Sequence, residues 1–396
     1  MKTAEIKSMA TAYIMNTYGD RKLAFVRGEG AYIWDADGVK YLDFLGGIAV
    51  NSLGHCHPNV VSAIREQAGT LIHVSNLYYI EPQAKLAKLL IDNCDLDQCF
   101  FCNSGAEANE AAIKLARKYI KDQGRTDAYE IITMENSFHG RTMATITATA
   151  QTKYHKGFEP MLPGFKYVPY DDLSAVEATI SERTCAILVE TIQSEGGVNT
   201  PSSGYLQGLR ELCDKHKLVL IFDEVQTAMG RLGTFFGYQS YGVIPDILTM
   251  AKSLGAGVPI GAMLAKKHLA DSFVPGTHAA TFGGNPLVTA AACATVQTIL
   301  DENLGENAVK MGNYLADKLM QLQDRHPIKE VRGKGLLRGL VLSVDANALA
   351  SKCIENGLIT ICTNNYVLRF LPPLNITTEH VDEAVSIVEK SLAEGP

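Results

Sequence analysis

Residues 218–223 read Leu218-Val-Leu-Ile-Phe-Asp223, five consecutive apolar side chains followed by a carboxylate. A surface strand alternates apolar and polar positions, whereas a strand buried on both faces is apolar throughout. This segment is therefore predicted to be a central strand of a parallel sheet that helices cover on both faces. Asp223 then ends the strand at the carboxyl edge of the sheet, where such folds bind ligands.

Short apolar runs alternate with amphipathic stretches on either side of this segment, which predicts an α/β core. Further strands are expected at 130–134, 185–190, 247–251 and 260–265. A helix is predicted from Ala106, with one apolar face and with Glu110 spaced to pair with Lys114. The central sheet is thus expected to be mostly parallel.

The two ends of the chain predict a smaller α+β domain. Residues 32–44 suggest a hairpin that turns at Asp37-Gly38. After a long helix beginning near Pro286, strands are expected at 340–344, 358–361 and 367–371, and a helix at 377–392. We therefore expect an N-terminal segment (residues 1–50) that joins the small domain, a large domain (51–300) and a C-terminal small domain (301–396).

The composition is that of a compact globular protein, with 46% hydrophobic and 20% charged residues among 396. The net charge of −7 comes without a Lys/Arg run, so nucleic acid is not an expected partner. Residues 1–16 contain no apolar run typical of a signal peptide, and no stretch approaches the roughly 20 apolar residues of a membrane span. A cytoplasmic protein with reduced cysteines is expected, since its nine cysteines are scattered and odd in number.

Two patterns suggest a metal site and are rejected. Cys99-Phe-Phe-Cys102 has the spacing of a zinc or redox pair, but residues three apart on a strand point to opposite faces. His55-Cys-His57 lies in a loop, and the chain offers it no second ligand pair. No metal is expected.

The chemistry is predicted from three places in the sequence. Lys252 follows another apolar strand, and a lysine buried there tends to lose its proton and act as a nucleophile, unless it extends to water. A pyridine cofactor held as a lysine Schiff base also needs an acid near its ring nitrogen, which Asp223 can supply unless it only caps a helix. Asn103-Ser-Gly-Ala106 opens into a helix, so Ser104, Gly105 and Ala106 can cradle a phosphate unless they are an ordinary helix start.

A family resemblance rests on motifs that occur in order along the chain. They are Phe101-Cys-Asn-Ser-Gly-Ala-Glu-Ala-Asn109, Ser137-Phe-His-Gly-Arg-Thr142, Phe222-Asp-Glu-Val-Gln-Thr227, Ala251-Lys252, Thr281-Phe-Gly-Gly-Asn-Pro286 and Val331-Arg-Gly-Lys-Gly335. With them the chain resembles the class III, fold type I aminotransferases throughout its length. Phe25-Val-Arg-Gly-Glu-Gly30 and Val367-Leu-Arg-Phe-Leu-Pro-Pro-Leu-Asn-Ile376 resemble the acetylornithine group of that family most.

The resemblance implies pyridoxal 5′-phosphate (PLP) as the cofactor, bound in the large domain by Lys252 with Asp223 at its ring nitrogen. Gly105 and Ala106 would bind its phosphate through backbone. The other implied cofactor contacts are Phe138 and Val225 on the two ring faces, Gln226 at the phenolic oxygen, and Thr281 at the phosphate of the partner subunit in a homodimer.

The implied reaction transfers the terminal amino group of N-acetylornithine to 2-oxoglutarate, giving N-acetylglutamate 5-semialdehyde and glutamate, a step of arginine biosynthesis. Arg141 would bind the α-carboxylate of the incoming amino acid through a bidentate pair. Glu195 and Arg369 would form a switch that lets one pocket accept first the ω-amine and then glutamate.

The chain departs from the family pattern at four positions. Glu190-Thr-Ile-Gln-Ser-Glu-Gly-Gly197 replaces the usual Glu-Pro-Ile-Gln-Gly-Glu-Gly-Gly, Ser253 replaces a glycine, and Ala280 stands where acetylornithine enzymes often carry a hydroxyl. Any substrate contact of Ala280 must be through backbone or van der Waals contact. Succinyl-diaminopimelate, ornithine and 4-aminobutyrate stay open as donors, a mutase or decarboxylase as the reaction, and a non-catalytic α/β binding protein as a different class.

Overall fold

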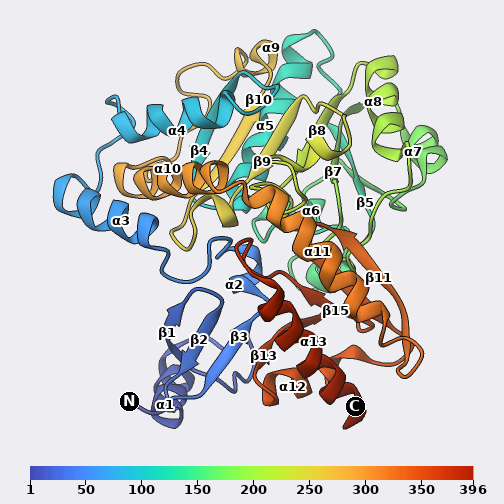
Figure 1. The fold of residues 1–396 in the computed structure, drawn as a ribbon. Coiled ribbons are helices and arrows are strands. Elements are labelled where there is room, and N and C mark those ends of the chain that lie inside the picture. The colour runs from blue at the N-terminus through green and yellow to red at the C-terminus, as the bar shows by residue number, and fades with distance from the viewer. Residues whose placement is uncertain (396) are drawn as a thin grey trace.

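The fold is built on a seven-stranded sheet, in a computed structural model that describes residues 1–395 (Figure 1). The strand order is β4-β10-β9-β8-β7-β5-β6. The strands are β4 (Gln98–Cys102), β5 (Glu130–Met134), β6 (Phe165–Val168), β7 (Thr184–Glu190), β8 (Val219–Asp223), β9 (Ile247–Met250) and β10 (Gly261–Ala265). All neighbours from β9 to β6 are parallel, and β10 runs antiparallel to β9 and β4. The prediction of a mostly parallel sheet is confirmed.

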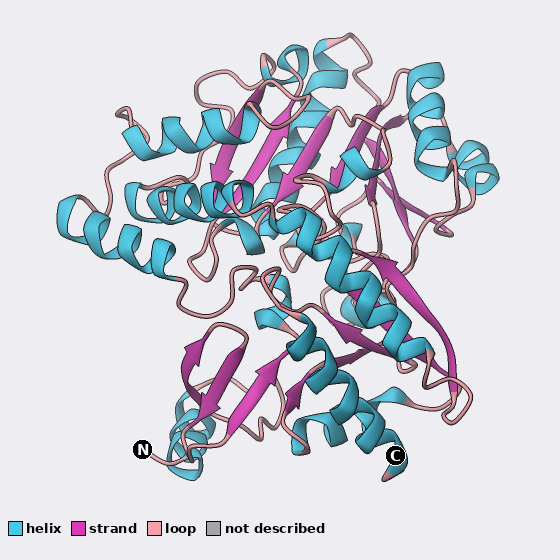
Figure 2. Ribbon diagram, viewed as in Figure 1, coloured by secondary structure: helices cyan, strands magenta, loops and turns pink. Residues whose placement is uncertain are grey.

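The strand β8 shows why an uninterrupted apolar run was needed. Leu220 and Phe222 are fully buried in one hydrophobic cluster, and Ile221 is fully buried in another. The first cluster includes residues of α4 (Glu81–Ile91), α7 (Leu173–Thr179), α8 (Tyr205–His216) and α10 (Pro286–Asp301), and the second includes residues of α5 (Gly105–Asp122), α6 (Met143–Ala148) and α9 (Lys267–Ala270). Helices therefore cover both faces of the sheet (Figure 2).

Two smaller sheets bring the ends of the chain together. One has the order β1 (Phe25–Glu29), β2 (Tyr32–Asp35), β3 (Lys40–Asp43), β13 (Leu358–Ile359), and the other β11 (Ile328–Lys334), β12 (Leu337–Leu342), β15 (Val367–Phe370), β14 (Ile361–Thr363). The predicted hairpin is confirmed as β2–β3. The parallel pairing of β3 with β13 fastens the N-terminal segment to the C-terminal part, with which it lies below the large sheet in Figure 1. Domain boundaries at residues 50 and 300 stay predictions.

The remaining helices are α1 (Thr3–Tyr13), α2 (Gly46–Ala49), α3 (Pro58–Thr70), α11 (Leu304–Met320), α12 (Ala346–Glu355) and α13 (Thr378–Ala393). The expected pair of Glu110 with Lys114 is wrong. Glu110 instead accepts a hydrogen bond from the Thr142 hydroxyl, and Lys114 lies within hydrogen-bond distance of His278. Residues outside the helix thus take the place of the expected partner one helical turn away. Within residues 1–395 no helix has the length and apolar character that crossing a membrane requires, and no group of three or more His, Cys, Asp or Glu side chains could hold a metal ion.

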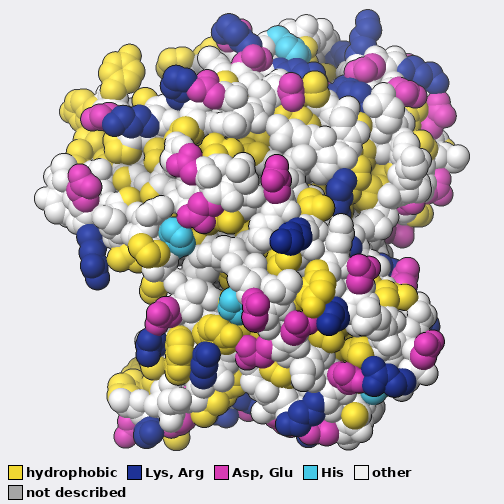
Figure 3. Space-filling model, viewed as in Figure 1, with side chains coloured by type: hydrophobic (Ala, Val, Ile, Leu, Met, Phe, Trp, Pro, Cys, Tyr) yellow, Lys and Arg dark blue, Asp and Glu magenta, His cyan; other side chains and the backbone are white. Residues whose placement is uncertain are grey.

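One edge of the molecule exposes large apolar side chains. Hydrophobic residues gather there beside α3 and α4 (Figure 3). The connection between these helices exposes Leu71, Ile72, Leu77, Tyr78 and Tyr79, the last of them completely. An exposed apolar patch of this kind marks an interaction surface.

The packing of α11 leads to a stability prediction. Gly312 lies in this helix, and a Cβ there would come 1.8 Å from the carbonyl oxygen of Gly335. Gly312→Ala should lower the free energy of unfolding by about 2 kcal/mol or more, because overpacking against backbone outweighs the ~1 kcal/mol that alanine gains in helix propensity. Chemical denaturation measures the change.

Gly69→Ala in α3 is the matched control, since nothing lies within 4 Å of a Cβ at that position. It should leave stability unchanged or raise it by up to about 1 kcal/mol. Equal effects of the two substitutions would contradict the steric argument.

Candidate active site

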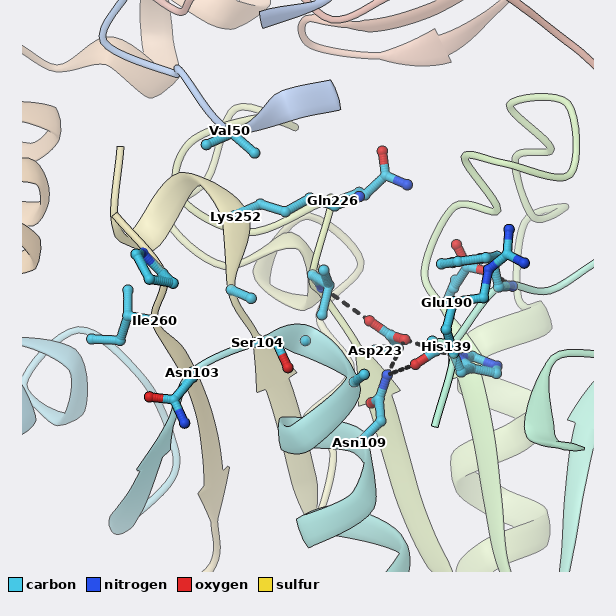
Figure 4. A pocket seen from close by; sticks show the side chains of 18 of the residues that line it. Val50, Asn103, Ser104, Asn109, His139, Glu190, Asp223, Gln226, Lys252 and Ile260 are labelled. Carbon is cyan, nitrogen blue, oxygen red and sulfur yellow. Dashed lines mark hydrogen bonds and ion pairs between the residues drawn. The ribbon is translucent and has the colours of Figure 1, made fainter. Parts of the chain in front are cut away.

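A cavity of about 450 Å³ opens at the carboxyl ends of β8 and β9 (Figure 4). It is lined by residues from several separate segments, among them Ser104, Gly105, Ala106, Phe138, Arg141, Asp223, Val225, Gln226 and Lys252. The expected cofactor contacts of one subunit are thus brought together. Ala280 and Thr281 are not among the residues from 1–395 that line it, and Thr281 is exposed.

Asp223 is buried at the base of the cavity and held by three neighbours. Its Oδ2 accepts a 2.7 Å hydrogen bond from the Asn109 amide and lies 2.8 Å from His139 Nδ1, as the dashed lines in Figure 4 show. Its Oδ1 accepts the backbone N–H of Val225 at 3.0 Å. Thr249 donates in turn to the Asn109 carbonyl oxygen at 2.7 Å. A carboxylate so far from water needs these bonds to stay charged.

Glu190 ends β7 directly beside Asp223, the two residues being register partners across the strands. Burial and the charge of Asp223 raise the pKa of Glu190 to about 8, although Glu190 accepts backbone N–H groups from Phe138 and Ser194. Two adjacent buried carboxyl groups do not both ionise readily. Glu190 is therefore largely uncharged near neutral pH.

Lys252 follows β9, and its side chain extends across the cavity toward Gln226 in Figure 4. Burial lowers its pKa to about 8; the Glu195 carboxylate opposes this shift and Arg369 adds to it. Its φ is +42°, a strained backbone value for a residue that carries a side chain. An amine with a lowered pKa is a nucleophile at moderately alkaline pH.

The amino end of α5 forms the opposite wall. Ser104 caps the helix by accepting the Glu107 N–H at 3.2 Å, and the helical ladder begins with Ala108 N–H to the Ser104 carbonyl. The N–H groups of Gly105 and Ala106 precede that first bond, so they can bind an anion together with the positive end of the helix dipole. Gly105 is required for packing, because a Cβ would lie 2.8 Å from a methyl group of Val225.

The two arginines expected to bind substrate are placed differently: Arg141 lines the cavity, whereas Arg369 and Glu195 are not among its lining residues from 1–395. Arg141 is exposed and lies over the Tyr154 ring at 4.1 Å and the Phe138 ring at 5.5 Å. Arg369 is fully buried on β15 and pairs with Glu195 at 3.0 Å, the two residues that were expected to form a switch. Burial opposes the ionisation of Glu195, but Arg369 and Lys252 outweigh it, so the pKa of Glu195 is lowered.

These residues fit a phosphorylated pyridine, since they provide an anion-binding helix end, a buried carboxylate and an amine with a lowered pKa. A family model described as class III aminotransferase matches residues 13–392. The chain belongs to the class III aminotransferases. The acetylornithine aminotransferase of Caldanaerobacter subterraneus subsp. tengcongensis is 50% identical over 384 residues, covering 96% of this chain and 98% of that protein.

Solved structures of related enzymes agree with the assignment of this chain to the aminotransferase family. The ornithine aminotransferase of Toxoplasma gondii, with PLP at partial occupancy in its active site, has a TM-score of 0.95 at 34% identity and covers 99% of this chain and 95% of its own. The acetylornithine aminotransferase of Elizabethkingia anophelis has a TM-score of 0.89 at 34% identity, with full coverage of both chains. The fold type I assignment is confirmed.

The sequence prediction missed four residues of the aminotransferase site. Asn109 and His139 lie inside quoted motifs but were given no role, and Glu190 and Ser194 were noted only as part of a departing motif. The available signal was a polar residue at the end of an apolar strand or on the inner face of a helix. Which of them would contact Asp223 depends on packing between β5, α5 and β8.

The lowered pKa of Lys252 predicts a distinct labelling profile. In cofactor-free enzyme, acetylation of Lys252 by trace acetic anhydride should rise with a midpoint near pH 8, because burial favours the neutral amine that reacts. Exposed lysines ordinarily titrate near 10.4. Peptide mass spectrometry at low conversion measures both. A Lys252 midpoint above pH 10 would show that burial does not depress its basicity.

Proposed function

We propose that this enzyme transfers the terminal amino group of N-acetylornithine to 2-oxoglutarate, using PLP bound by Lys252. The observation that carries the donor is the 50% identity, over 96% of this chain, to a relative named acetylornithine aminotransferase. The donor would yield N-acetylglutamate 5-semialdehyde, and 2-oxoglutarate would then yield glutamate.

Each part of the cavity has a task in this proposal. The α5 amino end would bind the phosphate, Phe138 and Val225 would hold the ring between them, and Gln226 would donate to the phenolic oxygen. Asp223 would keep the ring nitrogen protonated, and His139 and Asn109 hold Asp223 in place. When bound, PLP draws electrons away from the substrate carbon that bears the amine. Lys252 removes a proton from that carbon and returns one on the cofactor side.

The Glu195–Arg369 pair supports the use of one pocket for two substrates. When the acylated donor binds, the pair neutralises the guanidinium and Arg141 holds the donor's carboxylate. When glutamate or 2-oxoglutarate binds, Glu195 moves away and Arg369 takes the α-carboxylate, while Arg141 takes the side-chain carboxylate. Without Glu195, the buried Arg369 guanidinium would have no counter-charge during the first half-reaction.

A donor ranking tests the assignment. The visible absorption of the PLP enzyme should be lost fastest, at matched concentrations, with N-acetylornithine, ahead of succinyl-diaminopimelate, ornithine and 4-aminobutyrate. Lys252→Ala is the control and should abolish turnover, because no other lysine lines the cavity within residues 1–395. Faster reaction with another amine would replace the donor, and normal turnover by Lys252→Ala would reject the enzyme mechanism.

Arg369→Ala should separate the two half-reactions. We expect it to cost roughly 2 to 4 kcal/mol in the 2-oxoglutarate and glutamate half-reaction, because it removes a charge-assisted pair in a closed site, and less with N-acetylornithine. Arg141→Ala should impair both, since both substrates place a carboxylate there. Single-turnover absorbance measures each half-reaction. Equal losses for Arg369→Ala in the two would reject the switch.

The proposal includes a cytoplasmic homodimer in which Thr281 completes the partner's phosphate site. The nine cysteines are all unpaired, which supports a reducing compartment and can be tested by cell fractionation. The exposed patch of Leu71 to Tyr79 supports a second copy as partner, because Phe282, 60% exposed, lies beside it: Asn76 donates to the carbonyls of Ala280 and Gly283.

Sedimentation tests the dimer. The wild type should be a dimer. The double variant Tyr78→Asp, Tyr79→Asp should dissociate it, because charged groups would replace aromatic side chains that the second copy covers. Such a monomer should also bind PLP more weakly, since Thr281 of the second copy is lost from each site. Tyr366→Asp, an exposed tyrosine outside this patch, is the matched control and should stay dimeric. A wild-type monomer with full PLP affinity would overturn the arrangement.

A further inference from the structure

Ser194 is one of the positions at which this chain departs from the family pattern, and its side chain is completely buried. Its hydroxyl lies between two groups of the active site. Arg369 Nη1 donates to Ser194 Oγ at 3.0 Å, and Ser194 Oγ donates to Gln226 Oε1 at 3.0 Å. A serine hydroxyl has one hydrogen to donate and two lone pairs to accept with, so both bonds can exist at once.

Arg369 depends on this contact more than its ion pair suggests. Its Nη1 bonds to both Glu195 and Ser194, whereas its Nε and Nη2 are buried without a hydrogen-bond partner within residues 1–395. Buried donors without partners are costly, and an incoming carboxylate could satisfy this pair of them bidentately. If Glu195 moves away to admit that carboxylate, Ser194 remains as the side chain that holds Nη1 of Arg369.

Gln226 is oriented by the same hydroxyl. Because its Oε1 accepts from Ser194, its amide nitrogen is left to donate, and Nε2 already contacts Glu195 Oε1 at 3.3 Å. Gln226 also lines the cavity. Without the hydroxyl the amide could turn its oxygen toward the cavity, where a phenolic oxygen would repel it.

We infer that Ser194 is a positioning residue that anchors Arg369 when Glu195 releases it and fixes the Gln226 amide with its donor end toward the cofactor. The inference rests on the proposed use of one site for two substrates. A glycine at this position, the usual family residue, leaves both tasks undone. Ser194 therefore matters most for the substrate that carries two carboxylates.

The affinities of two unreactive ligands for the PLP enzyme, measured by calorimetry, test whether Ser194 anchors Arg369. Glutarate offers two carboxylates and would need Arg369 and Arg141, whereas N-acetylnorvaline offers one and would need Arg141 alone. Ser194→Ala and Ser194→Gly should weaken glutarate about tenfold to a hundredfold, the effect of losing one hydrogen bond to a charged group, and change N-acetylnorvaline less than twofold.

Thr191→Val is the matched control, because it removes another buried hydroxyl from the same segment. The Thr191 hydroxyl bonds to Thr227 and not to Arg369 or Gln226. It should leave both affinities within twofold of wild type. Equal weakening of both ligands by the Ser194 variants, or no weakening of glutarate, would overturn the inference. The donor assignment is judged separately, since failure of the wild type to react with N-acetylornithine does not affect the comparison of glutarate affinities.

The pH dependence of the visible absorption of the PLP enzyme tests the orientation of the Gln226 amide. A donor facing the phenolic oxygen stabilises its negative charge, and an oxygen that loses this donor holds a neighbouring proton more tightly. The pH midpoint of the absorption change should therefore rise by about half a unit in the Ser194 variants and not in Thr191→Val. An unchanged midpoint in the Ser194 variants would overturn the role assigned at Gln226.

Discussion

The buried carboxylate of Asp223 is the constraint around which the site is arranged. A charged group at 4% exposure is stable only if neighbours replace its lost water, and His139, Asn109 and the Val225 N–H do so. Burial, together with this neighbouring carboxylate, raises the pKa of Glu190 on the adjacent strand to about 8, so Glu190 is largely uncharged near neutral pH. This arrangement fits the role we propose for Asp223, which is to keep the ring nitrogen of PLP protonated.

The site lies where the large sheet meets the C-terminal sheet. Arg369 comes from β15, whereas its partners Ser194 and Glu195 follow β7. The fully buried Arg231 also joins these parts, donating to the carbonyls of Leu336 and Pro372 and to Ser52 Oγ. Burial lowers the pKa of Arg231 to about 9. Two buried arginines, Arg369 and Arg231, thus connect the large sheet to the C-terminal part of the chain.

Apolar runs predicted the central strands well because a doubly covered strand needs an apolar side chain at every position. The segment 130–134 matches β5, and 218–223 matches β8 to within one residue. The strand β6 was missed because it lies at the sheet edge, where Lys166 and Tyr167 are exposed. The antiparallel direction of β10 follows from its short connection to β9, which has no crossover helix.

The sequence by itself determined the fold class and the positions of Asp223 and Lys252, because Asp223 ends one apolar strand, Lys252 closely follows another, and the carboxyl ends of parallel strands share one edge. It also identified Arg369 and Glu195 through a family resemblance, not through any local pattern. Only the tertiary structure decided that Asn109 and His139 hold Asp223 and that Ser194 lies between Arg369 and Gln226. Such contacts join residues up to 175 positions apart, and the angle at which separate elements pack, not the periodicity of one element, determines which side chains meet.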